Sequence, residues 1–167
     1  MSHVDYFLKI DGIPGEAQDA RHKGEIQLES WSMASTTGTD RSPGMAAKVH
    51  DVNCSCRMSI ASAKLMLACA SGQHIAKAVL TARKAGKGQE DFFKVTFSDV
   101  LVASYRISGG KISRKGGADG ENIIPQEDFS LNFARVDYEY RMQKQDGSLS
   151  GTVKSSYSVK DEKGQGQ

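Results

Sequence analysis

Hydrophobic and polar residues alternate along most of this chain, which is the pattern of half-buried β-strands. Eight stretches show it, separated by turn residues: 4–10, 26–33, 50–59, 76–83, 93–97, 100–107, 129–142 and 153–159. Strands with one apolar and one polar face pack either as a closed barrel or as two facing sheets. The sequence therefore predicts a mainly β fold of about eight strands, connected in places by long loops.

Two of these stretches change the side on which their apolar residues lie. Ile26 and Leu28 are followed by Trp31 on the opposite parity, and Phe133 is followed in the same way by Val136. One extra residue in a strand shifts the parity in this manner. We therefore expect β-bulges near residues 29–30 and near Ala134.

One stretch, residues 59–72 (SIASAKLMLACASG), breaks the alternation and predicts the only helix. It consists mostly of strong helix formers, Ser59 suits the start of a helix, and Gly72 suits the left-handed residue that ends one. Lys64 is its sole charge. A helix that is apolar nearly all round is expected to be buried on most of its surface, here packed against the strands.

Several other segments lack periodicity. Residues 16–24 are too charged to pack as part of a core, and the polar tail 161–167 is expected to fray. Residues 36–48 (TTGTDRSPGMAAK) form an unusually long connection, which is either a surface loop or an arm that reaches a neighbouring molecule. The glycine-rich loop 108–121 is basic, and it is either a solvated hairpin tip or a contact for nucleic acid or an acidic protein surface.

Composition narrows the class of protein. A chain of 167 residues is most simply one domain, residues 1–167. Its 22 basic and 20 acidic residues nearly balance, which argues against a dedicated nucleic-acid binder. No apolar run reaches membrane-spanning length, and the N-terminus lacks the pattern of a signal peptide. We expect a protein made in the cytosol, without stable membrane insertion.

The sequence offers no positive case for catalysis, and we predict no enzyme, no cofactor and no metal. No serine lies in a nucleophile-elbow motif, and the four histidines are scattered. Cys54 and Cys56 point to the same face of a strand, and with Cys69 they are interpreted as reduced core thiols. The alternative is a zinc site with His50 and His74, but the spacing matches no known zinc pattern.

Four stretches, in order, resemble the Hcp family, the haemolysin co-regulated proteins. They are DYFLKIDGIPGEAQDARHKGEIQLESWS, LMLACASGQHIAKAVLTARKAG, FKVTFSDVLVAS, and FSLNFARVDYEY with GTVKSSYSV near the end. The resemblance covers residues 4–159. The chain departs from the family in a longer and more basic loop at residues 108–126, and in Ala17, which stands where serine is expected.

The resemblance implies a structural tube protein of a type VI secretion system. Such proteins form hexameric rings of small β-barrels with a helix to one side, and the rings stack into a tube. A contractile sheath surrounds the tube, a VgrG-type spike tips it, and effectors travel in its lumen. The chain is then expected in the cytoplasm before firing, and afterwards outside the cell or in a target cell, without use of a signal peptide.

The resemblance also assigns roles to residues. The arm becomes a contact with an adjacent ring or subunit, with these candidate residues: Thr37, Gly38, Asp40, Arg41, Pro43 and Met45. Trp31 and Met33 are expected on the packed side of their strand, which would turn Ser30 and Ser32 toward the lumen and its effectors. The alternative for these serines is an ordinary exposed surface. Partner contacts are expected at Lys111, Arg114 and Lys115, and ring contacts at Arg57, Lys77 and Arg83.

Two other classes of protein remain open. An oligonucleotide-binding barrel would use the basic loop, but it needs aromatic residues placed for base stacking. Tyr138 and Tyr140 instead share parity with Val136 and Met142, which is typical of core positions. An enzymatic version would carry a toxin domain fused to the tube protein, and the length of the chain argues against one.

Overall fold

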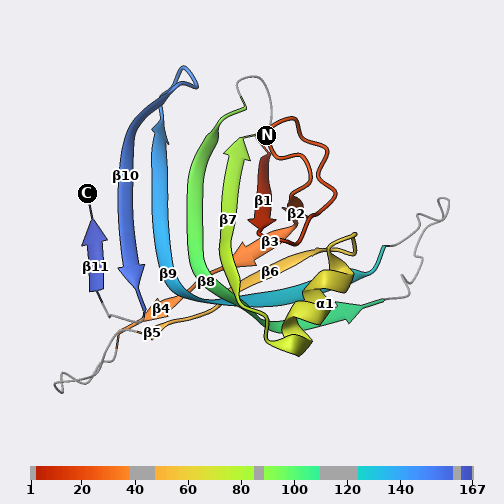
Figure 1. Ribbon diagram of the computed structural model, residues 1–167. Helices are drawn as coiled ribbons and strands as arrows, with labels where there is room; N and C mark the ends of the chain where they lie inside the picture. The colour runs from red at the N-terminus through yellow and green to blue at the C-terminus, as the bar shows by residue number, and fades with distance from the viewer. Residues whose placement is uncertain (1–2, 38–47, 85–88, 110–123, 160–162, 167) are drawn as a thin grey trace, which may run out of the picture.

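Strands dominate the structure, a computed structural model that describes residues 3–37, 48–84, 89–109, 124–159 and 163–166 (Figure 1). The described part contains eleven strands and one helix: β1 (Val4–Ile10), β2 (Ile26–Leu28), β3 (Ser30–Ser32), β4 (Ser35–Thr36), β5 (Lys48–Val49), β6 (Val52–Arg57), α1 (Ser62–Ser71), β7 (Ile75–Lys84), β8 (Asp91–Ser108), β9 (Gln126–Gln143), β10 (Leu149–Ser158) and β11 (Lys163–Gly166). The mainly β prediction is confirmed.

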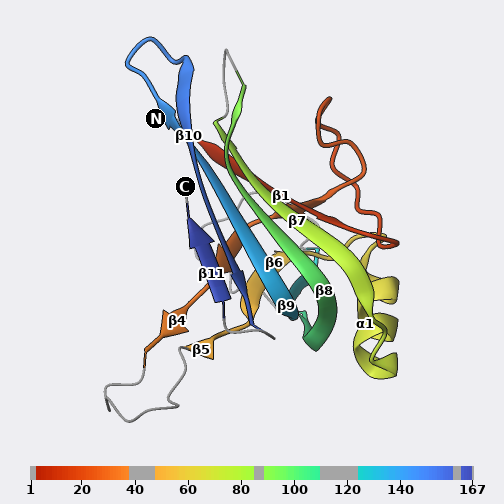
Figure 2. The same cartoon turned by 60° about the vertical axis from the view of Figure 1, so that its left-hand side comes forward.

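Nine of the strands belong to one sheet that curls round to form a barrel. β1 pairs with β7, β7 with β8, β8 with β9, β9 with β6, and β6 with β3. Because β3 follows β2 in the chain and β2 pairs with β1, this series of pairings returns to its start. β10 and β11 extend the sheet from the outer half of β9 (Figure 2). Of the two architectures left open by the sequence, the barrel is the one observed.

The inside of the barrel is filled by aliphatic and aromatic side chains from every strand of the circuit. Phe97 and Phe133 lie with ring centroids 4.9 Å apart. The largest apolar side chains with almost no exposed surface are Leu8, Leu65, Leu80, Val52, Val95, Phe97, Val100, Phe129 and Leu131. Burial of these residues provides most of the stabilisation of the fold.

The predicted change of parity at residues 29–30 is confirmed, but its cause is a change of partner. β2 pairs with β1, whereas β3 pairs with β6. Between them the backbone N–H of Glu29 donates to the carbonyl of Ser55 at 2.8 Å. The strand thus changes its pairing partner from β1 to β6 within a single residue.

The two longest strands, β8 and β9, have 18 residues each and serve both halves of the sheet. The sequence predicted two shorter strands where β8 is continuous. The bulge predicted near Ala134 is wrong, because pairing with β8 runs without a shift from Phe133 to Arg135, and the shift lies between Val102 and Ser104. Near Ala134, β9 leaves β6 and begins to pair with β10, which changes its buried side.

The helix α1 packs against β8 on the outside of the barrel (Figures 1 and 2). Leu65 and Ala68 are buried, but Met66 and Leu67 are 50% and 59% exposed. The prediction of burial on most of its surface is therefore wrong for the single chain, because only the side of the helix with Leu65 and Ala68 joins the core. Gly72 ends the helix with φ 64°, as predicted.

The start of the helix differs slightly from the prediction. The hydroxyl of Ser59 accepts a hydrogen bond from the backbone N–H of Ala61 at 3.2 Å, and the regular helix begins only at Ser62. Ser59 therefore stabilises the turn that leads into the helix.

The connection between β1 and β2 is packed against the barrel, so the prediction that residues 16–24 do not pack is wrong. Ala17 and His22 are buried, and the backbone N–H of Ala17 donates to the carbonyl of Glu25 at 3.0 Å. Gly15 makes this close approach possible, since a Cβ atom there would lie 2.4 Å from the carbonyl oxygen of Glu25. The buried Ala17 stands at the position where the family resemblance led us to expect serine.

The C-terminal end is also more ordered than predicted. Lys163–Gly166 forms strand β11 on the edge of β10, so the prediction of a frayed tail is wrong for these residues. A tight turn at residues 146–147 joins β9 to its neighbour β10, and Gly147 in it has φ 85°.

Candidate functional site

The sequence-predicted serines lie on the outer face of a four-stranded part of the sheet, β3–β6–β9–β8. Ser30 and Ser32 are exposed, while Trp31 between them packs against the core, as predicted. Cross-strand pairing places two rows of polar residues on this face: Ser32, Asn53, Ser130 and Ser104 in one, and Ser30, Ser55, Asp128 and Arg106 in the other. We call this surface the polar face.

Hydrogen bonds within the polar face engage its carboxylates. The Ser55 hydroxyl donates to Asp128, and the Asn132 amide donates to Asp51 at 2.8 Å. The hydroxyls of Ser104 and Ser130 are 2.6 Å apart. Ser30, Ser32 and Arg106 line an open depression of about 570 Å³ on this face.

Beneath the polar face lies a buried carboxyl group. Glu127 accepts a hydrogen bond from the Tyr105 hydroxyl at 2.9 Å and one from the Cys56 thiol at 3.3 Å. Burial, reinforced by Glu127, raises the pKa of Tyr105 to about 12. Burial likewise raises the pKa of Cys56, so both groups stay protonated at neutral pH and can act as donors. These hydrogen bonds link β6, β8 and β9 beneath the polar face.

The cysteines are free, as predicted, and burial raises the pKa of Cys54 to about 12. A thiol with so high a pKa is a poor nucleophile and metal ligand at neutral pH. The proposed zinc partners are engaged elsewhere, His50 with Thr36 at 3.2 Å and His74 with Asp99 at 3.1 Å. Within the described ranges, no three potential ligand side chains are grouped to hold a metal ion.

The arm is carried by a short two-stranded ribbon. Ser35–Thr36 pairs with Lys48–Val49, and Thr37 is exposed at its end. The other predicted arm residues, Gly38, Asp40, Arg41, Pro43 and Met45, lie outside the described residues, as do Lys111, Arg114 and Lys115 of the basic loop.

The three cations expected at ring contacts have different environments. Arg83 is 3% exposed and forms an ion pair with Asp19 of its own chain, so its assignment to a contact between subunits is wrong. Arg57 is exposed and binds Glu29 at 2.8 Å. Lys77 is exposed, and no ion pair to it is found among the residues that the structure describes.

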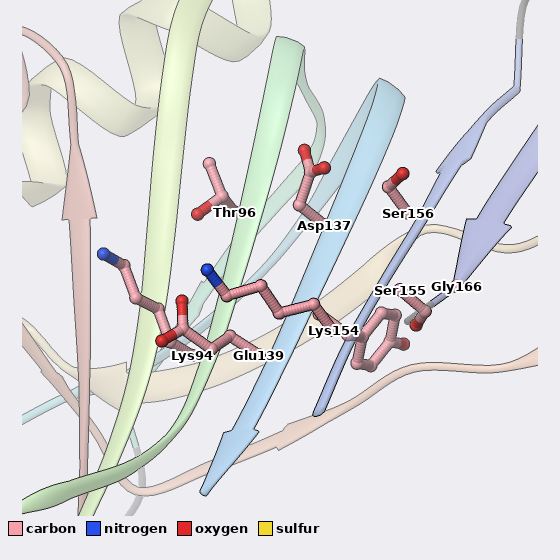
Figure 3. Close-up of a pocket in the computed structure, with 9 residues that line it drawn as sticks. Lys94, Thr96, Asp137, Glu139, Lys154, Ser155, Ser156 and Gly166 are labelled. Carbon is pink, nitrogen blue, oxygen red and sulfur yellow. The ribbon is translucent and has the colours of Figure 1, made fainter. Parts of the chain in front are cut away.

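A second polar surface lies on the other half of the sheet, over β8, β9 and β10 (Figure 3). It is a shallow depression of about 430 Å³, and a cross-strand row of Lys94, Glu139 and Lys154 crosses it. Charges of both signs alternate here, which is typical of a solvated or protein-contacting surface.

The aromatic residues on the opposite side of these strands do not make a base-stacking platform. Tyr138 is partly buried beside Phe93, with centroids 5.9 Å apart, as expected for a core position. Tyr140 is 47% exposed, so the prediction that it belongs to the core is wrong. Stacking of several bases needs more than one exposed ring on one face.

Sequence reasoning found the two serines but not the residues that complete the polar face. Asn53 and Ser55 alternate with the buried cysteines along β6 and therefore lie on the opposite face. Ser104, Arg106 and Asp128 come from strands distant in the sequence, and only the pairing register brings them beside the serines.

Comparison with known proteins gives a consistent result. The family model described as "Type VI secretion system effector, Hcp" matches residues 7–140. The protein Hcp1 of Pseudomonas aeruginosa is 35% identical over 164 residues, which cover 94% of this chain and 96% of that protein.

Solved structures agree in fold. The crystal structure of Hcp1 from Salmonella typhimurium is 35% identical, with a TM-score of 0.77, and the match covers 99% of this chain and 100% of that one. A structure described as a type six secretion system protein has a TM-score of 0.84 at 25% identity, covering 98% and 100% of the two chains. Among the described residues, no helix has the length and apolar character needed to cross a membrane.

Proposed function

Because this chain belongs to the Hcp family of type VI secretion system proteins, we propose that six copies close into a ring whose lumen is lined by the polar face. The chain is a structural subunit of the secretion tube. The observation that carries the proposal is the four-stranded sheet β3–β6–β9–β8, which has a polar outer face and, among the described residues, a strand edge without a partner at each side.

The outer edges of β3 and β8 support ring closure. Among the described residues, β3 pairs only with β6, and β8 beyond Val100 pairs only with β9. Exposed strand edges are sites where another chain adds to a sheet. The four strands alternate in direction, so β3 of one copy can lie antiparallel beside β8 of the next. This contact joins two different surfaces of the chain, and such head-to-tail contacts generate rings.

Closure in this manner would make the polar face of each copy continuous with the next. Ser32 lies in the row of hydroxyl and amide groups and belongs to the edge strand β3. The lumen wall would then consist mainly of short polar side chains. Cargo bound through a few exchangeable hydrogen bonds could leave the tube after expulsion.

We expect Ser32→Gln to abolish effector binding by intact rings, because the longer side chain would project into the lumen from every copy. Copurification of a tagged effector with the ring measures this, and ring assembly is followed by native mass. Ser71→Gln is the matched control, since Ser71 is exposed at the end of the helix, away from the polar face. Undiminished effector binding by assembled Ser32→Gln rings would show that Ser32 does not contact cargo.

We propose that the arm of residues 36–48, including Thr37, Gly38, Asp40, Arg41, Pro43 and Met45, joins one ring to the next. The ribbon β4–β5 that carries it projects from the barrel at the end opposite the β9–β10 hairpin (Figure 1). Because β4 and β5 form a separate sheet, this ribbon is available for contact with another ring without disturbing closure of its own. Lys111, Arg114 and Lys115 are proposed to contact another partner.

Deletion of residues 37–46 is expected to leave the ring intact and to prevent stacking, because β4 and β5 lie outside the nine-stranded sheet. Electron microscopy of the deletion variant at a concentration at which the full chain forms tubes provides the measurement. Tubes of normal length from the deletion variant would contradict this role of the arm.

The remaining partners follow from the family. We propose that the tube assembles in the cytoplasm inside a contractile sheath, below a VgrG-type spike, and is then expelled from the cell or into a target cell. Its role in this process is structural rather than enzymatic. The arrangement of Glu127 with a tyrosine and a cysteine of high pKa supports this, since it provides neither an accessible base nor an activated nucleophile.

A further inference from the structure

A buried histidine holds the β1–β2 connection against the barrel. The two ring nitrogens of His22 each lie 2.9 Å from a carboxylate oxygen: Nδ1 from Oε2 of Glu25 and Nε2 from Oδ1 of Asp91. His22 is 6% exposed, and its ring stacks on Phe7, with centroids 4.5 Å apart and planes 8° from parallel. Glu25 belongs to the same connection, whereas Asp91 begins β8.

The number of hydrogen bonds that the His22 ring can donate depends on whether the ring is protonated. A neutral imidazole has one N–H and one acceptor nitrogen, whereas an ionised carboxylate only accepts. A neutral His22 could therefore satisfy only one of its two neighbours, and the other contact would bring two lone pairs together. A protonated ring donates to both. We propose that protonated His22 is a clasp that fastens residues 13–25 to β8 and opens when the ring loses its proton.

The other charged groups around the clasp do not titrate near neutral pH. Asp19 accepts from the backbone N–H of His22 at 3.2 Å and is paired with Arg83 of β7, which lies over Phe7. The negative charge of Asp5 on β1 also attracts the guanidinium of Arg83. Carboxylates and arginines keep their charge between pH 6 and 9, whereas imidazole is the kind of side chain that can change its charge in that range.

Two basic residues next to His22 allow opening of the connection to be measured by proteolysis. Arg21 and Lys23 are exposed on either side of His22 in the sequence, and each is a trypsin site. Arg21 donates to the carbonyl of Gln89 at 2.9 Å, so cleavage requires release of the connection. The folded full chain and a free peptide of residues 13–26 are digested in parallel, which corrects for the pH dependence of trypsin itself.

We expect cleavage of the folded chain, relative to the peptide, to rise roughly tenfold between pH 6.5 and pH 9.0, the effect of losing about one charged hydrogen bond. His22→Gln should be cleaved rapidly at both pH values. His74→Gln should behave as the unchanged chain, since His74 is exposed and contacts a single carboxylate. Equal relative rates at the two pH values in the unchanged chain would overturn the proposal.

Asp91→Asn separates the clasp from a merely structural histidine. The amide of asparagine can donate to Nε2 of a neutral ring while Nδ1–H donates to Glu25, so both contacts survive loss of the proton. This variant should resist cleavage at pH 6.5 and at pH 9.0. Rapid cleavage of Asp91→Asn at pH 9.0 would overturn the proposal. The readout does not involve ring assembly, so it is independent of the proposed function.

Discussion

Asp19→Ala is expected to lower the free energy of unfolding by about 3–5 kcal/mol, because it leaves a buried guanidinium without its counterion. Arg83 is 3% exposed, and Asp19 is its ion-pair partner. Two of its nitrogens, Nε and Nη1, are already buried without a partner among the described residues. Urea unfolding of the full chain, at one fixed protein concentration, measures the loss.

Glu29→Ala is the matched control. It removes the carboxylate from a second arginine pair, but the side chain of Arg57 is 70% exposed and becomes hydrated when its partner is lost. Exposed pairs contribute about 0–1 kcal/mol. Equal losses in the two variants would contradict the assignment of Arg83 as a buried, dependent charge.

The same pair predicts a response to acid. The hydrogen bond from Arg83, with backbone N–H groups that point at the carboxylate, holds the pKa of Asp19 well below its usual range. Since the folded pKa lies below the unfolded value of about 4, the stabilisation is fully present above that value and is lost as the pH falls toward the folded pKa. The difference in stability between the unchanged chain and Asp19→Ala should therefore shrink below about pH 4.

Leu65→Ala is expected to cost about 2–5 kcal/mol of stability, because it leaves a cavity between the helix and the barrel. Leu65 has no exposed surface. Leu67, two residues further along the same helix, is 59% exposed, and Leu67→Ala should change the unfolding free energy of the single chain by less than about 0.5 kcal/mol.

Thermal or urea unfolding of the two leucine variants gives this comparison directly. Both variants remove the same atoms from the same helix, so their helix propensities match. A loss at Leu67 as large as that at Leu65 would mean that the outer side of the helix is covered.

Local patterns were sufficient to predict much of this fold. Alternation located the strands, Gly72 located the end of the helix, and the parity of Trp31 placed Ser30 and Ser32 on the outer face. These features depend on residues close together in the chain. Period and capping chemistry report on such short-range structure.

The errors arose where distant residues decide the outcome. The charged segment 16–24 was predicted not to pack. In the structure its charged side chains pair with Arg83 and Asp91, which lie far away in the sequence and could not be identified from the segment itself. The apolar helix was predicted to be buried on most of its surface, but only its Leu65 and Ala68 side packs into the core. The full polar face required the register of β6, β9 and β8, which no single strand encodes.

The central claim is that this chain closes into six-membered rings. Light scattering coupled to size-exclusion chromatography tests it most directly, by giving the native mass of the purified full chain. We expect a mass about six times that of the 18.1 kDa chain, in a single peak. A clean monomer that persists at high concentration would show that the chain does not close into rings.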